Sequence, residues 1–248
     1  MNPEENRGPD KADKTEGEEK MIKFVFFDLD ETILDFTKAE ANALSRTLCA
    51  FGIEPTAHVI ERYHEVNISQ WRLMEEGKLS RVGVLTRRFE LLFAELGWDV
   101  DVVSFNDQYE IFLGQGHFFL PGAESVLKEL APLYHLYLAT NGASSVQRGR
   151  LKSAELEPWF KGIFISEEVG YNKPSIEYFQ TCFSKIPDFD PSNAIIIGDS
   201  LTSDIRGGKN AGIQTCWLNR EGKAPDYDII PDFTIHTLEE LPALLKQL

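Results

Sequence analysis

The sequence is poor in cysteine and has no long hydrophobic run. Its three cysteines, Cys49, Cys182 and Cys216, are widely spaced, and no pair has the spacing of a metal finger. We therefore interpret them as reduced, mostly buried thiols of a cytoplasmic protein. No apolar run approaches the roughly 18–20 residues that span a bilayer, and the N-terminus lacks the apolar core of a signal peptide. These absences argue against a disulfide scaffold and against a membrane partner.

Positive charge is also scarce. The chain has 25 Lys and Arg residues against 40 Asp and Glu residues, a net charge of −15 at pH 7, which argues against binding to a nucleic-acid polymer. An anionic substrate would need a metal ion or local cations at its site. Residues 1–20 are almost all charged residues, Pro, Gly or Asn, and we expect them to form a disordered tail.

The first half of the chain is rich in helical patterns. Apolar residues recur at helical spacing in four segments, and none of the intervening residues forms a convincing strand. So long a helical stretch exceeds an ordinary crossover between parallel strands. We therefore predict an inserted helical domain over residues 36–118, with helices at 36–52, 55–77, 80–97 and 99–114.

The rest of the chain alternates strands with helices, which predicts an α/β fold with a doubly wound parallel sheet. A core domain would comprise residues 21–35 and 119–248, with a first buried strand that ends at Phe27. Further strands are expected at 134–139, 162–166, 194–197, 214–218 and, more weakly, 233–235. Helices are expected at 124–132, 144–156, 175–183 with Pro174 in the first turn, 203–211 and 238–246.

Polar residues follow three of these strands. Because parallel strands direct their carboxyl ends to one edge of the sheet, the three clusters should meet there and form an active site. Two carboxylates at positions i and i+2 also repel each other unless a cation or a shared proton relieves them. The clusters are Asp28, Asp30 and Thr32; Thr140, Asn141 and Gly142; and Gly198, Asp199 and Ser200, with Asp204 beyond.

Together these clusters suit a hard divalent cation and a phosphate. Carboxylates are the ligands that Mg²⁺ prefers, and the turn after Thr140 leads into a helix whose amide hydrogens suit an anion. Single features have simpler explanations. Asp204 could stabilise a helix N-terminus, and the turn after Thr140 could be a plain connection. Lys173, which precedes a helix, could be a solvated surface residue.

The chain resembles the haloacid dehalogenase-like hydrolases, because all four signature motifs of that family occur in order. They are DLDET at 28–32, Thr140, Lys173 before Pro174, and GDSLTSD at 198–204. The resemblance covers residues 21 to about 245 and implies a Rossmann-like core with a helical cap inserted after the first motif. The strings TNGASSVQRGRL and ISEEVGYNKP are most similar to bacterial pyrimidine 5′-nucleotidases and their relatives.

The resemblance implies a role for each motif residue. Asp28 would be the nucleophile that forms an aspartyl-phosphate, and Asp30 would protonate the leaving oxygen and then activate water. The transferred phosphoryl group would be bound by Thr140, the Asn141 amide and Lys173. Mg²⁺ would be held by Asp28, the Asp30 backbone carbonyl, Asp199 and, directly or through water, Asp204. Many relatives have Gly where this chain has Glu31, although the nucleotidase-like subgroup also carries Glu there.

The sequence thus predicts a Mg²⁺-dependent phosphomonoester hydrolase, with a nucleoside 5′-monophosphate ahead of a sugar phosphate or phosphoglycolate as its substrate. A 2-haloacid dehalogenase, a phosphomutase and a non-catalytic binding module remain as alternatives, and the oligomeric state is open. Asp35 is expected to be a turn or hinge residue near the cap. Substrate contacts are conceivable for six cap side chains, although packing or solvation explains each more simply: Phe36, Trp71, Arg72, Arg87, Arg88 and His117.

Overall fold

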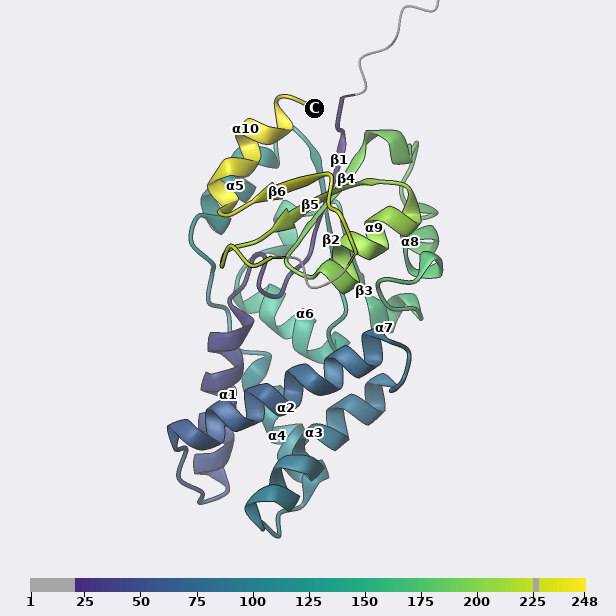
Figure 1. The fold of residues 1–248 in the computed structure, drawn as a ribbon. Helices are drawn as coiled ribbons and strands as arrows, with labels where there is room; N and C mark the ends of the chain where they lie inside the picture. Colours follow the sequence, from purple (N-terminus) through teal and green to yellow (C-terminus); the bar gives the residue numbers. More distant parts are fainter. Residues whose placement is uncertain (1–20, 225–227) are drawn as a thin grey trace, which may run out of the picture.

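Six parallel strands form one sheet in the computed structural model, which describes residues 21–224 and 228–248 (Figure 1). Their order across the sheet is β3-β2-β1-β4-β5-β6. After β3 the chain crosses to the other side of β1, and such a switch point is where open α/β sheets bind ligands. The predicted α/β fold with a doubly wound parallel sheet is confirmed. The strands are β1 (Phe24–Phe27), β2 (His135–Thr140), β3 (Gly162–Ile165), β4 (Ala194–Gly198), β5 (Gln214–Leu218) and β6 (Phe233–Ile235).

The central strands are buried on both faces. All residues of β1 and β4 are buried, and alternate side chains enter two separate cores. Val25 and Ile197 pack in one core and Phe26 and Ile196 in the other. Helices α5 (Ala123–Leu130), α6 (Ser144–Ser153) and α10 (Leu241–Leu245) contribute to the first core, and α8 (Ile176–Phe183) to the second. This part also contains two short α-helices, α7 (Ser166–Val169) and α9 (Arg206–Ala211), and short 3-10 helices at Glu157–Trp159, Pro191–Asn193 and Leu238–Glu240.

Four helices follow β1 and form a layer at one end of the sheet (Figure 1). We call α1–α4 the helical insertion. It has its own core, in which the ring centroid of Phe89 lies 5.0 Å from those of Tyr63 and Phe105. Val146 of α6 also belongs to this core, so α6 adjoins both parts. The helices are α1 (Phe36–Ala50), α2 (Ala57–Glu75), α3 (Arg81–Leu96) and α4 (Val102–Leu113).

The two segments that connect the helical insertion to the sheet run side by side. The Asp35 amide donates to the Phe118 carbonyl at 2.8 Å, and the Leu120 amide donates to the Ile33 carbonyl at 3.0 Å. The Asp35 side chain also caps α1 by accepting from the Lys38 amide. Both connections are thus tied to each other next to the end of β1.

Several local predictions were wrong. Helix α8 begins at Ile176 because the Ser175 hydroxyl caps it, so Pro174 precedes the helix and does not lie in its first turn. The helix expected at 203–211 is divided into a π-helical turn, Leu201–Ile205, and α9. Helix α7 was not predicted, because one turn is too short to show a period. The expectation that the cysteines are mostly buried, by contrast, agrees with the structure: Cys182 and Cys216 are buried, and Cys49 is exposed.

Two further expectations concern the N-terminal tail and membrane-spanning segments. The predicted tail, residues 1–20, lies outside the described residues. Among residues 21–224 and 228–248, no helix combines the length and the hydropathy needed to cross a membrane.

Candidate active site

Three carboxylates and one lysine meet where β1 and β4 end. Carboxylate oxygens of Asp28, Asp199 and Asp204 lie within 4.8 Å of one another. The Lys173 ammonium donates to Asp28 Oδ1 at 2.7 Å, to Asp204 Oδ1 at 2.6 Å and to the Ala139 carbonyl at 2.7 Å. Lys173 is 2% exposed and Asp204 is fully buried. Side chains from three of the four family motifs therefore form one cluster.

The local backbone explains this convergence. The Asp28 amide extends the pairing of β1 with β4 by donating to the Ile197 carbonyl at 2.9 Å, so Asp28 and Asp199 leave adjacent strands at nearly the same height. Position 198, just before Asp199, requires glycine, because a Cβ atom there would lie only 2.1 Å from Asp204 Oδ2. The Ser200 amide then donates to Asp204 Oδ2 at 3.2 Å, which holds that carboxylate toward the cluster.

The charges of the cluster are not balanced. Burial raises the pKa of Asp28 to about 8, with Lys173 opposing and Asp204 adding to the rise. Burial, followed by the charges of Asp28 and Asp204, raises the pKa of Asp199 well above its usual value. Burial alone would lower the pKa of Lys173, but the two carboxylates that it contacts raise it. Three carboxylates against one ammonium leave an excess of negative charge that a hard divalent cation would neutralise. The donor set therefore fits Mg²⁺.

Asp30 lies outside this cluster but lines the same cavity, and its carboxylate is bound by α6. The Arg150 guanidinium pairs with Asp30 Oδ1, and the Gln147 amide donates to Asp30 Oδ2 at 2.7 Å. The same Gln147 nitrogen donates to the Thr140 hydroxyl at 2.9 Å. Helix α6 thus connects the first motif with the second.

The Asn141 side chain anchors the loop that carries Lys173. Its Nδ2 donates to the Lys173 carbonyl at 2.9 Å, and its Oδ1 accepts from the Lys173 amide at 2.9 Å. The Asn141 amide side chain is therefore occupied by the protein. Thr32, by contrast, is fully buried and does not line the site; its hydroxyl has no hydrogen-bond partner among the described residues.

A cavity of about 560 Å³ lies between this edge of the sheet and the helical insertion. Asp204 is buried beneath it and does not line it. Of the six cap candidates, Phe36, Trp71, Arg72 and Arg88 line the cavity, whereas Arg87 and His117 do not. The sheet edge contributes Asp28, Asp30, Thr140, Asn141, Lys173 and Asp199.

Sequence reasoning assigned no contact to Glu75 or Glu31, which both line the cavity. Glu75, at the end of α2, accepts from the Thr202 hydroxyl at 2.6 Å and so connects the helical insertion to the loop after β4. Glu31 has a positive φ of 56°, a conformation that glycine adopts more readily. Its carboxylate accepts from the Thr37 amide at 2.7 Å and pairs with Arg220. A charged residue in a helix or turn gives no sequence signal that it is directed inward.

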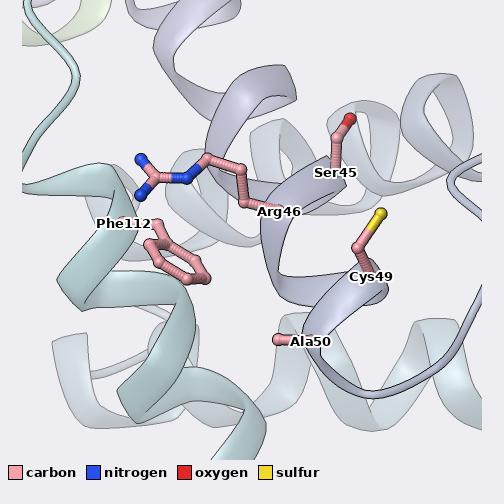
Figure 2. Close-up of a pocket in the computed structure, with 5 residues that line it drawn as sticks. All are labelled: Ser45, Arg46, Cys49, Ala50 and Phe112. Atoms are coloured by element: carbon pink, nitrogen blue, oxygen red, sulfur yellow. The ribbon is translucent and has the colours of Figure 1, made fainter.

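A second hollow, of about 490 Å³, lies in the helical insertion (Figure 2). It is formed by α1 and α4 and shares no residue with the first cavity. The Arg46 guanidinium lies over the Phe112 ring, 4.0 Å from its centroid. The hollow has no carboxylate, and we assign no chemistry to it. Its lining comprises Ser45, Arg46, Cys49, Ala50 and Phe112.

Comparison with known proteins agrees with this geometry. A family model described as haloacid dehalogenase-like hydrolase matches residues 22–212. The HAD-hydrolase YfnB of Bacillus subtilis is 42% identical, over 92% of this chain and 97% of its own length. Its magnesium-bound crystal structure, which is described as revealing interdomain movement, superposes with a TM-score of 0.87 over 91% of this chain and 99% of that one.

Two further relatives have a named activity. The pyrimidine 5′-nucleotidase PynA of Streptococcus pneumoniae is 35% identical, over 88% of this chain and 93% of its own length. The pyrimidine 5′-nucleotidase YjjG of Escherichia coli is 32% identical, over 90% of this chain and 97% of its own length.

Proposed function

The chain belongs to the haloacid dehalogenase-like hydrolases, and on that basis we propose that it is a magnesium-dependent phosphatase of small phosphomonoesters. The observation that carries the proposal is the cluster of Asp28, Asp199 and Asp204 around Lys173. Asp28, Asp199 and Asp204, with the Asp30 carbonyl, would hold Mg²⁺. The bound cation would keep the carboxylates ionised and neutralise charge that develops on the phosphoryl group.

The proposed reaction has two steps. A carboxylate oxygen of Asp28 attacks phosphorus and forms an aspartyl-phosphate, while the leaving oxygen takes a proton from Asp30. Asp30 then accepts a proton from a water molecule that attacks the same phosphorus, which releases inorganic phosphate and restores Asp28. Lys173, the Thr140 hydroxyl and the Asn141 backbone amide would bind the oxygens of the transferred group.

We further propose that residues 36–118 act as a cap over a core formed by residues 21–35 and 119–248. The separate core of the helical insertion and its two adjacent connections support this division. The cap would exclude water from the reaction and supply the contacts that select the substrate. The cavity volume lies in the usual range for sites that bind small molecules, about 300–1,000 Å³.

The comparison favours a nucleoside 5′-monophosphate as the substrate of this chain, since PynA and YjjG are named pyrimidine 5′-nucleotidases. A sugar phosphate is the second candidate. A haloacid dehalogenase needs no metal, so the acidic cluster, which suits a divalent cation, argues against that activity. The same proposal includes a small phosphomonoester as the binding partner. It also includes a cytoplasmic location, which suits three free cysteines.

Phosphate release tests the proposal. Purified protein with MgCl₂ should release phosphate from p-nitrophenyl phosphate and, faster, from one of a panel of nucleotides and sugar phosphates. EDTA should abolish the release, and Mg²⁺ should restore it. Asp28→Asn should lower turnover by at least about 10³-fold, the scale expected for loss of a nucleophile. Unchanged turnover in Asp28→Asn, or undiminished release in EDTA, would refute the proposal.

A further inference from the structure

Arg150 is a fully buried arginine outside the four motifs. Its Nη1 pairs with Asp30 Oδ1 and donates to Gln147 Oε1 at 3.2 Å. Its Nε donates to the Gly116 carbonyl at 3.1 Å. Nη2 is buried and has no hydrogen-bond partner among the described residues. Burying a guanidinium with an unpaired donor is costly, and a buried ion pair is weak evidence for a stabilising role. The position therefore calls for a functional explanation.

Arg150 links Asp30 to the connections of the helical insertion. With Gln147 at Asp30 Oδ2, both side-chain oxygens of Asp30 are bound by α6. On its other side, the guanidinium contacts both connections to the helical insertion. The ring centroid of Phe36, the first residue of α1, lies 5.5 Å from the guanidinium carbon, and Gly116 follows α4. Arg150 thus fixes Asp30 relative to the cap connections as well as to the site.

We propose that Arg150, assisted by Gln147, is the positioning residue that orients the Asp30 carboxyl toward the leaving oxygen of the substrate. This inference rests on the proposed function, because it concerns the acid of that reaction. A carboxyl group on a loop of its own would sample several rotamers, whereas Arg150 Nη1 at Oδ1 and Gln147 Nε2 at Oδ2 together hold it in one orientation. Arg150 itself does not line the cavity, so it acts through Asp30 and not on the substrate.

The inference is tested by substrates that differ in their need for an acid. A nucleoside 5′-monophosphate has an alkoxide leaving group that must be protonated, whereas p-nitrophenolate leaves without a proton. The value of kcat/KM reports the steps up to transfer to Asp28 and excludes the later hydrolysis. In Arg150→Met, kcat/KM should fall about 10²-fold for the nucleotide, the lower range for general acid catalysis, and about threefold or less for p-nitrophenyl phosphate.

Three further variants make the comparison specific. Asp30→Asn sets the reference, because it should show the same selective loss. Arg150→Lys, which keeps the charge but loses the Nε contact with the Gly116 carbonyl, should regain part of the loss. Arg148→Met is the matched control, since Arg148 lies on the same helix and pairs with Glu168 at the surface. It should leave the ratio of the two kcat/KM values unchanged.

Two results would overturn the inference. One is an equal loss for both substrates in folded Arg150→Met, which would make Arg150 merely structural. The other is no loss for either. If Arg150→Met does not fold, Arg150→Lys and Gln147→Met carry the same comparison, and an unchanged ratio in both would refute the inference. Activity in Asp28→Asn would instead refute the proposed reaction, so the two failures are distinguishable.

Discussion

Lys173 is the residue on which the charge distribution of the site depends. Its ammonium contacts two of the three clustered carboxylates and a main-chain carbonyl of β2. Asn141 holds its backbone from both sides. A single buried lysine cannot neutralise three carboxylates, and for that reason the site suits a divalent cation. Taken alone in the sequence, Lys173 is indistinguishable from a surface lysine, and only its place among the four motifs identifies it.

Gly198 gives a prediction at the scale of one atom. Because a Cβ atom at this position would overlap the Asp204 carboxylate, Gly198→Ala should lower the free energy of unfolding by about 1–3 kcal/mol, the usual cost of overpacking. It should also lower phosphatase activity by displacing Asp204. Urea unfolding and phosphate release check both effects. Wild-type stability together with wild-type activity would contradict the geometry described for Asp204.

His64 gives a pH-dependent prediction. Its Nδ1 lies 2.5 Å from Glu40 Oε2, and this hydrogen bond raises the pKa of His64. A raised pKa in the folded state means that folding favours the imidazolium. The stabilisation is fully present below the ordinary histidine pKa of about 6.5 and is lost as the pH rises through the folded-state pKa.

The measurement is urea unfolding of wild type and His64→Gln at about pH 6 and about pH 9, which lie below and well above the ordinary histidine pKa of about 6.5. The destabilisation caused by His64→Gln should be larger at the lower pH. His58→Gln, at an exposed position on the same helix, should show no such difference. An equal destabilisation by His64→Gln at both pH values would contradict the assigned hydrogen bond.

Among the elements, α3 and α2 each connect the helical insertion to the sheet edge through one side chain. Arg81, the first residue of α3, donates to Asn172 Oδ1 at 2.5 Å and also contacts Ser166. Glu75, at the end of α2, accepts from Thr202. Asn172 immediately precedes Lys173, so the Arg81 contact couples the position of the proposed cap to the loop that carries the site lysine.

Loss of the Arg81 contact should favour an open arrangement of the cap. A hydrogen bond from a charged group contributes about 1.5–3 kcal/mol, so Arg81→Met should lower kcat/KM about tenfold or more, mainly through a higher KM. Steady-state kinetics check this, with Arg87→Met, at an exposed position on the same helix, as the matched control. Equal effects of the two variants would show that the contact does not influence closure.

For the whole molecule, the sequence was informative where reactive polar residues come after a recognisable strand pattern. Asp28 directly follows a buried apolar run and Asp199 follows another after one glycine, so the strand pattern alone predicts that they share an edge. Arg150 and Gln147 could not be found in this way. They lie on a helix whose polar residues suggest a solvent-exposed surface, and their burial depends on the cap connections that pack beside α6. The bounds of the proposed cap stay a prediction.

The most direct test of the account is whether phosphate is transferred to Asp28. Rapid mixing of the Mg²⁺-loaded protein with a nucleoside 5′-monophosphate, followed by acid quench and peptide mass spectrometry, should show a phosphate adduct on the peptide that contains Asp28. The adduct should be absent from Asp28→Asn and from protein treated with EDTA. Release of phosphate at the wild-type rate by Asp28→Asn, with no adduct on that peptide in either protein, would contradict the central claim.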